Sequence, residues 1–132
     1  MSIRLAHKED LDQLKVLLAQ LTIVGDPQSI DEEVFDNIFV YVLEDKIVGC
    51  ATLLVEKKII HQGGKVGHIE DVTVDNIYRQ QGIGQKLIDH CIRVATERGC
   101  YKVILDCDEK NVKFYEKCGF KSHGICMRLN CN

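Results

Sequence analysis

The 132-residue sequence predicts an α+β fold, in which helices flank a mixed and mostly antiparallel β-sheet. Three observations lead to this fold class. Two extended apolar runs, 39–43 and 47–55, flank a short polar turn, which is typical of an antiparallel hairpin. A strand, a long helix and another strand follow one another between residues 66 and 107, the order of a parallel βαβ unit. Leucines also recur at steps of three and four after Lys8, the spacing of an amphipathic helix.

The N-terminal part of the chain predicts a strand followed by two helices. Ile3 and Leu5 alternate with polar neighbours, as in a short strand. The first helix begins near Lys8, has one apolar face and is stopped by the Gly-Asp-Pro sequence at 25–27. A second, short helix starts at Ser29, whose hydroxyl caps it, and its first turn is acidic, which suits the helix dipole. The apolar face of the first helix consists of Leu11, Leu14, Leu17, Leu18 and Leu21.

The middle of the chain predicts the hairpin, a loop and a further strand. The polar turn 44–46 joins the two strands of the hairpin, which are rich in β-branched residues. Segment 57–65 contains two adjacent glycines and several lysines, so we expect a mobile, cationic loop there. The strand that follows covers 66–74.

The C-terminal part of the chain predicts the βαβ unit and a closing strand. A long helix begins near Gly82 and ends at Gly99, a residue well suited to a C-terminal cap. A strand at 103–107, a short helix at 111–118 and a last strand at 125–129 complete the chain. A ligand can enter where parallel strands joined by a helix diverge. The inner face of the long helix consists of Leu87, Ile88, Cys91, Ile92 and Ala95.

Composition limits the class of protein. The length fits a single domain over residues 1–132, and 17 basic against 20 acidic residues leave no general nucleic-acid surface. No apolar run reaches the roughly 20 residues of a membrane span, and the first residues have no stretch of signal-peptide length. We therefore expect no membrane partner and a cytoplasmic location. The seven cysteines are an odd number without C-x-x-C spacing, so we expect free, mostly buried thiols and no metal site.

The most informative segment is Arg-Gln-Gln-Gly-Ile-Gly at 79–84, which follows a strand and opens the long helix. Glycines at a helix start let backbone N–H groups approach a ligand, and the helix dipole favours an anion there. The segment lacks the G-K-[ST] ending of a Walker loop and the third glycine of a dinucleotide fingerprint. The sequence therefore predicts a pyrophosphate site. The alternative is a glycine-rich turn that only packs the helix on the strand.

Longer motifs give a resemblance to a known family. The pattern R-x-x-G-x-G after a strand resembles the pyrophosphate loop of the GNAT N-acetyltransferases. Segments 67–72, 99–107 and 111–120 are similar to the glucosamine 6-phosphate N-acetyltransferases within that superfamily. The resemblance implies the GNAT fold, with a splay between two parallel strands, and acetyl-CoA as co-substrate without a metal. It implies a role in UDP-N-acetylglucosamine biosynthesis.

The resemblance also assigns the acetyl-CoA site. The backbone of the strand before the loop would bind the coenzyme, and the loop would surround its pyrophosphate. Asn111, one helical turn before Tyr115, would contact the CoA arm. The residues implied are Val72, Thr73, Val74, Arg79, Gln80, Gln81, Gly82, Ile83, Gly84, Gln85, Asn111 and Tyr115.

Three residues are implied in the chemistry by the same resemblance. The N–H of Val72 would polarise the thioester carbonyl, although its side chain also suits core packing. Tyr115 would act as general acid or hydrogen-bond donor to the leaving sulfur. The alternative for Tyr115 is an amphipathic side chain with its ring in the core. Asp106 would hold the substrate amine through its backbone carbonyl, because positioning matters more than a strong base for a 2-amino sugar.

The implied acceptor is D-glucosamine 6-phosphate, and its phosphate needs a local group of cations. Glu70 and Asp71 would meet the sugar hydroxyls, but neighbours on a strand reach one ligand only where the strand bulges. The alternative is a solvated charge pair. Arg128 would replace a family arginine at the position of Asn130, and the region 26–39 is shorter than in many relatives. The implied substrate-binding residues are Thr22, Lys58, Ile59, Ile60, His61, Glu70, Asp71, Val72, Tyr101, Lys102, Asp106 and Arg128.

The resemblance further implies a homodimer whose sugar-phosphate site is shared across the interface. His68 is expected to be a hydrogen-bonded strand histidine. Two other functions stay open: an acetyltransferase for another small amine, and a non-catalytic acetyl-CoA-binding module. The cations Lys58, His61 and Lys102 favour a phosphate over a polyamine, and the intact glycine loop and Tyr115 favour an enzyme.

Overall fold

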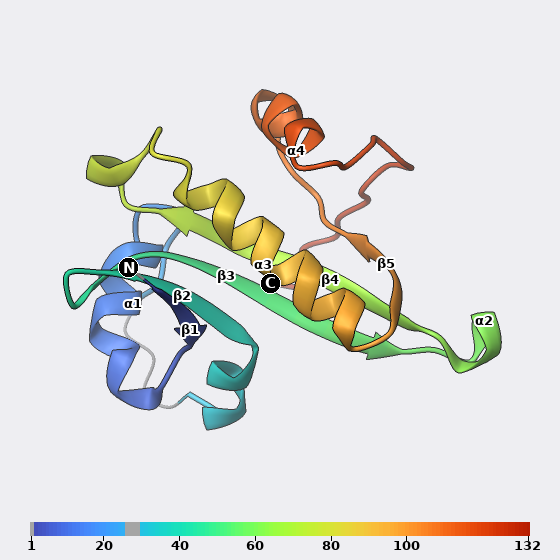
Figure 1. Ribbon diagram of the computed structural model, residues 1–132, viewed down its shortest axis with the longest axis horizontal. Coiled ribbons are helices and arrows are strands. Elements are labelled where there is room, and N and C mark those ends of the chain that lie inside the picture. Colours follow the sequence, from blue (N-terminus) through green and yellow to red (C-terminus); the bar gives the residue numbers. More distant parts are fainter. Residues whose placement is uncertain (1, 26–29) are drawn as a thin grey trace.

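Five strands lie side by side in chain order within the described residues 2–25 and 30–132 of the computed structural model (Figure 1). The β1–β2, β2–β3 and β3–β4 pairs are antiparallel, whereas β4 and β5 are parallel. The predicted mixed, mostly antiparallel sheet is therefore confirmed. The strands are β1 (Ser2–Leu5), β2 (Ile38–Leu43), β3 (Lys46–Lys57), β4 (Lys65–Val74) and β5 (Cys100–Ile104).

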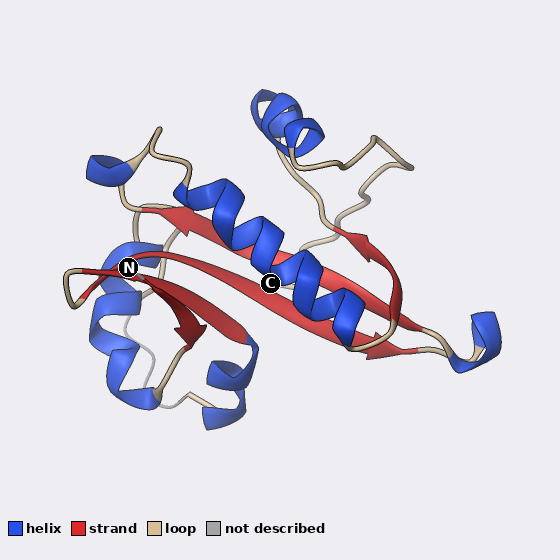
Figure 2. Ribbon diagram, in the orientation of Figure 1, coloured by secondary structure: helices blue, strands red, loops and turns tan. Residues whose placement is uncertain are grey.

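Helices cover both faces of this sheet (Figure 2). The long helix α3 (Ile83–Glu97) crosses one face, and α1 (Leu11–Leu18) lies on the other. The short helices α2 (Ile60–Gly63) and α4 (Val112–Lys117) lie at the ends of strands. Single 3₁₀ turns are η1 (Lys8–Asp10), η2 (Glu32–Asn37), η3 (Asn76–Tyr78) and η4 (Glu109–Asn111).

Strand β2 shows how one sequence pattern builds two cores. Its residues alternate between the faces of the sheet, and both faces are buried. Phe39 and Tyr41 pack with the α3 side, whereas Ile38 and Val40 pack with the α1 side. Burying each of these side chains contributes about 1.5–3 kcal/mol. The β2–β3 turn is tight because Glu44 and Asp45 both have positive φ, of 49° and 63°, as a two-residue hairpin turn requires.

Strand β4 carries the feature that opens the sheet. Its pairing with β5 ends at His68↔Ile104, although β4 continues to Val74. Its register with β3 shifts between Cys50 and Thr52, and Asp71 opposite this shift has φ 52°. This irregularity is a β-bulge, which bends and twists a strand locally. The predicted divergence of the two parallel strands is therefore confirmed, and the bulge lies within it.

Helix α1 and its surroundings differ from the prediction. The helix ends at Leu18 rather than near Gly25, because the apolar face ends there and Leu21 is 48% exposed. Ser29 lies outside the described residues. The following turn is 3₁₀ rather than α, and the side chain of Asp31 caps it by accepting from the Glu33 N–H at 3.0 Å.

The end of the chain also differs from the prediction. Strand β5 begins and ends three residues earlier than the expected 103–107. The expected last strand at 125–129 is wrong, because this segment has no strand pairing. Ile125, Met127 and Leu129 are 87%, 86% and 89% exposed. A strand needs a neighbouring strand to pair with its backbone, and the segment has none within the described chain.

The structure bears on the expectations of free, mostly buried cysteines and of no membrane-spanning helix. All seven thiols are free, but Cys107, Cys126 and Cys131 are exposed, so the expectation of mostly buried cysteines is too general. Cys50 and Cys91 are the fully buried pair. Within residues 2–25 and 30–132, every helix falls short of the length and apolar character that crossing a bilayer demands.

Candidate active site

The diverging end of β4 is the centre of the candidate site. Val72 and Val74 pack against the α3 core with their side chains, while Thr73 is buried on the opposite side at 4% exposure. The Thr73 hydroxyl donates to the Asp71 carbonyl at 3.4 Å. Since β5 has turned away here, the β4 backbone between 69 and 74 faces the gap between the strands. Side-chain packing and an accessible backbone therefore occur together at these residues.

The segment 79–84 connects this strand end to α3. The Arg79 guanidinium donates from Nε to the Val74 carbonyl at 3.2 Å and stays on the surface. Gln80 and Gly82 both have positive φ, of 65° and 79°. The first N–H groups of α3 have no acceptor within the helix, and they lie beside an arginine on an exposed loop. This arrangement concentrates positive charge and hydrogen-bond donors, as anion sites do.

The two glycines of the segment meet different requirements. Gly82 begins α3 in the left-handed conformation with open space around it, so it supplies backbone freedom. Gly84 has ordinary φ, but a Cβ on it would lie 3.1 Å from the Phe114 ring. It therefore lets α4 pack closely on α3. Packing of the helix therefore explains Gly84, whereas an anion site at the start of α3 stays a prediction that the backbone conformation of Gly82 permits.

Tyr115 lies on α4 at the other side of the gap. Its ring packs edge-on against Phe114 and Phe120, with centroids 5.0 Å and 6.1 Å away. Burial, with smaller effects from the neighbouring Cys107, Cys118 and Asp106, raises the pKa of Tyr115 to about 12. The phenol therefore keeps its proton at neutral pH. Asn111 precedes the helix and is exposed on the same short segment.

Three carboxylates gather at the bulge. Burial, followed by the negative charges of Asp106 and Asp71, raises the pKa of Glu70. The bulge changes the alternation of side chains at Asp71, so the condition under which both neighbouring acids reach one ligand is met. Glu70 is half-buried, whereas Asp71 and Asp106 are exposed. Neighbouring carboxylates attract a cation, such as the ammonium form of an amine.

The turn between β3 and β4, residues 58–64, is called the hairpin tip. It holds the predicted cations Lys58 and His61. It is a hydrogen-bonded turn rather than a mobile loop: the Lys58 N–H donates to Gly64 O at 2.8 Å. His61 stacks on Tyr101 with centroids 4.0 Å apart, and the Lys102 ammonium lies 5.6 Å from the Tyr101 centroid. Lys58 pairs with Glu56 at 3.1 Å. Ile59 and Ile60 are exposed on this tip, at 95% and 57%.

The hairpin tip and the diverging strands lie at opposite ends of β4. Lys65, beside the tip, and Val72 are seven residues apart, or roughly 20 Å at about 3.3 Å per residue.

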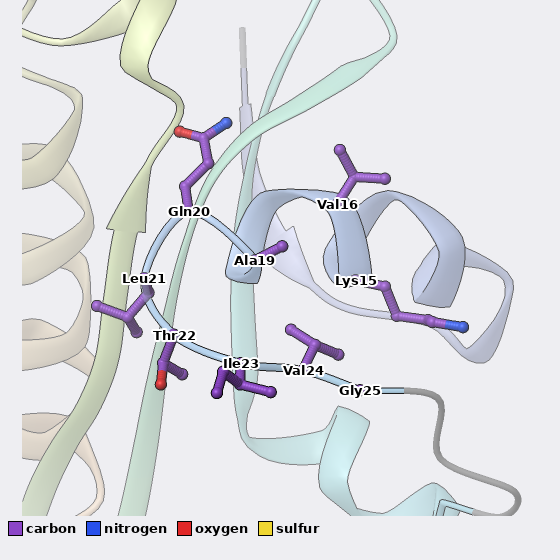
Figure 3. Close-up of a pocket in the computed structure, with 9 residues that line it drawn as sticks. All are labelled: Lys15, Val16, Ala19, Gln20, Leu21, Thr22, Ile23, Val24 and Gly25. Atoms are coloured by element: carbon purple, nitrogen blue, oxygen red, sulfur yellow. The ribbon is translucent and has the colours of Figure 1, made fainter.

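Thr22 lies away from both the tip and the diverging strands, in a pocket of about 600 Å³ formed by α1 and the segment after it (Figure 3). Arg128 is exposed and donates to Asn130 at 2.8 Å, and the expected strand that would aim it is absent from 125–129.

Two polar side chains at the site were not anticipated. Glu56 accepts from Lys58 and lies 2.9 Å from His68 Nε2, so it organises both side chains. The expected hydrogen-bonded state of His68 is confirmed. Gln20 accepts from the Asn76 N–H at 2.9 Å. The proximity of Glu56 to Lys58, two residues apart at the end of β3, was a usable signal, whereas nothing local to Gln20 indicates its distant partner. Among the described residues, no group of three His, Cys, Asp or Glu could hold a metal ion.

Known proteins share this architecture. The sequence profile of the Acetyltransferase (GNAT) family matches residues 11–120. The chain is 47% identical over 98 residues to glucosamine 6-phosphate N-acetyltransferase 1 of Dictyostelium discoideum, covering 71% of this chain and 62% of that protein. It is 39% identical over 126 residues to the Arabidopsis thaliana glucosamine 6-phosphate N-acetyltransferase, covering 84% and 83%. The crystal structure of the glucosamine-6-phosphate N-acetyltransferase from Arabidopsis thaliana has a TM-score of 0.88 at 35% identity, over 99% and 98% of the chains.

These matches establish the family. Because the profile covers most of the sequence and the fold agrees over nearly the whole chain, the protein belongs to the acetyltransferase (GNAT) family. The chain spans 62% and 64% of the length of the Dictyostelium discoideum and Trypanosoma brucei brucei relatives.

Proposed function

We propose that this protein transfers the acetyl group of acetyl-CoA to the 2-amino group of D-glucosamine 6-phosphate, giving N-acetyl-D-glucosamine 6-phosphate and CoA. The observation that carries the proposal is the parallel ladder that ends at His68 while β4 continues to Val74. That gap lies between an exposed anion-binding loop and a protonated tyrosine. The names of the relatives from Dictyostelium discoideum and Arabidopsis thaliana supply the acceptor.

Acetyl-CoA fits the gap between β4 and β5. Its extended pantetheine arm would pair with the β4 backbone at 72–74, as an added strand does. Its pyrophosphate would lie against Arg79 and the N–H groups at the start of α3, residues 80–85. Asn111, before α4, would contact the arm from the opposite side. The coenzyme would thus replace the hydrogen bonds that β5 gives up when it turns away.

The reaction needs few catalytic groups. The neutral amine attacks the thioester carbonyl carbon, a C–N bond forms, the C–S bond breaks and the amine gives up a proton. The Val72 N–H would donate to the carbonyl oxygen as negative charge develops on it. The departing thiolate accepts a hydrogen bond and finally a proton. The carbonyl of Asp106 would hold the amine at the carbon, where positioning supplies most of the acceleration.

The raised pKa of Tyr115 supports one of its two predicted roles, that of a hydrogen-bond donor. With a pKa of about 12, it is far less acidic than a thiol, for which cysteine at about 8.5 is the reference. Complete proton transfer to the thiolate is uphill by several kcal/mol. Tyr115 would therefore stabilise the leaving sulfur as a hydrogen-bond donor, and the proton that the thiolate finally takes comes from solvent or from the amine.

The carboxylates at the bulge would bind the amino sugar. Glu70 and Asp71 would accept hydrogen bonds from the sugar hydroxyls, and with Asp106 they favour approach of the protonated amine. The phosphate would bind Lys58 and His61 of the hairpin tip and Lys102 of the neighbouring β5, together with Arg128. Ile59, Ile60 and Tyr101 would surround it, and Thr22 would lie at the sugar.

The geometry of β4 supports a site that is shared between two chains of a homodimer. The hairpin tip of a chain lies roughly 20 Å from its own Val72, which is longer than a hexose phosphate, so one sugar cannot touch both. The tip would therefore serve the site of a second copy. Strand β5 is an open edge of the sheet, and Ile125, Met127 and Leu129 alternate as exposed apolar side chains. An edge strand and an unpaired, alternating segment are suited to pair between copies.

Thiol release measured with three acceptors tests the activity. Glucosamine 6-phosphate should be turned over rapidly, glucosamine poorly and spermidine least, because the tip cations attract a phosphate and repel a polyamine. Turnover of spermidine alone would replace the acceptor with another small amine. Acetyl-CoA binding without thiol release from any acceptor would make the protein a non-catalytic binding module. A cytoplasmic location stays a prediction.

Mixing two inactive variants tests the shared site. One variant carries Tyr115→Phe and the other carries Lys58→Ala with His61→Ala. Random exchange of subunits makes about half of the dimers hybrids, and each hybrid has one intact site, so about a quarter of the wild-type activity should return. If each site is built from one chain, mixing restores nothing.

A further inference from the structure

A side chain joins the segment after α1 to the loop before α3. Gln20 Oε1 accepts from the Asn76 backbone N–H at 2.9 Å, across 56 residues of sequence. In Figure 3 the Gln20 side chain extends away from Val16 and Lys15, toward the backbone that follows β4. The contact therefore links the segment that carries Thr22 to the loop before α3, two parts of the chain that no strand pairing connects.

Asn76 belongs to the segment that leads into the anion-binding loop. Asp75 caps this turn by accepting from the Ile77 N–H at 3.1 Å, and Lys46 lies 3.8 Å from the Asp75 carboxylate. Arg79 donates to the Val74 carbonyl at the end of the same segment. These contacts come from β4, from the first residue of β3 and from the segment itself. The bond from Gln20 adds a restraint from the α1 side, close to where Arg79 begins the loop.

Gln20 is also the first residue of segment 20–25, which would contact the sugar and is called the acceptor segment. Leu21 and Thr22 follow it directly, and both donate through their N–H groups to the Leu18 carbonyl, at 2.9 Å and 3.1 Å. Thr22 and Gln20 line the same pocket of about 600 Å³. This short, bonded turn ties Thr22 closely to Gln20. A shift of Asn76 would therefore be passed to Thr22 through only two residues.

We propose that Gln20 is a positioning residue that couples the acetyl-CoA loop to the acceptor segment 20–25. Ordering of the loop by acetyl-CoA fixes Asn76, the bond to Gln20 fixes the start of the segment, and the sugar phosphate then binds to a segment already in place. The assignment of the acceptor rests on the proposed function. By linkage, each ligand strengthens the binding of the other by the same factor, about fivefold for one hydrogen bond of this kind.

Three variants test the coupling. Gln20→Ala removes the side-chain oxygen that accepts the hydrogen bond from Asn76. Gln20→Glu keeps an oxygen at the same place and should restore the coupling. Gln13→Ala is a matched control, because Gln13 Oε1 accepts from the Ile47 N–H at 2.9 Å and so ties α1 to the sheet away from the site. The readout is the Kd of glucosamine 6-phosphate by calorimetry, with and without CoA. CoA should lower this Kd about fivefold in wild type, Gln20→Glu and Gln13→Ala, and leave it unchanged in Gln20→Ala.

A second readout separates this proposal from the identity of the acceptor. Hydrogen exchange of the amides at 19–25 should slow when CoA is added to wild type, and it should not slow in Gln20→Ala. This experiment needs no sugar, so it reports on Gln20 even if glucosamine 6-phosphate is not the acceptor. Equal behaviour of Gln20→Ala and Gln13→Ala, or failure of Gln20→Glu to rescue, would overturn the proposal.

Discussion

The rings of His61 and Tyr101 are stacked, with centroids 4.0 Å apart and planes 28° apart. The stack joins the hairpin tip to the first residues of β5. His61 and Gln62 are in the left-handed region, at φ 51° and 59°, where non-glycine residues are uncommon. The tip is therefore a formed structure before any phosphate binds. Gly64 makes it possible, because a Cβ there would lie 2.7 Å from the Tyr101 ring.

We expect Gly64→Ala to weaken binding of the sugar phosphate. Gly64 has an ordinary φ of −67°, so the alanine changes only the contact with Tyr101 and displaces its ring from His61. The KM for glucosamine 6-phosphate should rise about tenfold, while the KM for acetyl-CoA stays within twofold. Steady-state kinetics with each substrate varied measures both. Equal changes in the two KM values would contradict a local effect at the tip.

We expect Tyr115→Phe to lower kcat about a hundredfold with little change in the KM for acetyl-CoA. The substitution keeps the ring contacts with Phe114 and Phe120 and removes only the hydroxyl that would donate to the leaving sulfur. Thiol release under saturating substrates measures the effect. Tyr78→Phe is the control, because its ring keeps the contact with Lys46. An unchanged kcat in Tyr115→Phe would remove this residue from the chemistry.

We expect Arg79→Ala to raise the KM for acetyl-CoA about tenfold and to leave the KM of the sugar phosphate nearly unchanged. The variant removes a cation from the loop together with the bond from Nε to the Val74 carbonyl. Calorimetry with CoA and with pantetheine as ligands shows which part of the coenzyme binds more weakly, since pantetheine has no pyrophosphate. Arg93→Ala, on an exposed part of α3, is the control. Equal weakening of pantetheine would assign Arg79 a structural role only.

We expect the free energy of unfolding to fall as pH rises from about 9 to 12. Burial raises the pKa of Cys91 to about 12, and burial with the charge of Asp71 does the same for Cys50. The unfolded thiols titrate near 9.0, so above that pH the unfolded chain binds fewer protons than the folded one and is favoured. The effect is absent below pH 9 and grows to several kcal/mol by pH 12.

Urea unfolding with a reducing agent, measured at several pH values between 8 and 11, checks this prediction. Cys91→Ala should flatten the pH dependence while lowering stability at every pH, since it also leaves a small cavity. Cys131→Ala is the control, because that thiol is exposed. An identical pH dependence in wild type and Cys91→Ala would contradict the assignment to buried thiols.

Local patterns account for the parts of the site that depend on neighbouring residues. The segment 79–84 could be located because Gly82 follows a strand and begins a helix, and both facts are visible over a few residues. The short apolar run at 39–43, rich in β-branched residues and followed by a polar turn, likewise identifies a strand. The sequence showed only that Glu70 and Asp71 could reach one ligand if β4 bulged there. Whether β4 bulges at Asp71 depends on the register of its pairing with β3 across the sheet.

The sequence by itself determined the order and type of most elements, the place of the glycine loop 79–84 at the start of α3, and the family. These follow from periodicity, glycine positions and contiguous motifs, which are local properties of a chain. The tertiary structure decided that Gly84 makes room for Phe114, that Gln20 reaches Asn76 and that the hairpin tip lies far from Val72. It also removed the strand expected at 125–129. Each of these depends on which surfaces meet after folding, and a strand forms only where another strand's backbone is there to pair with it.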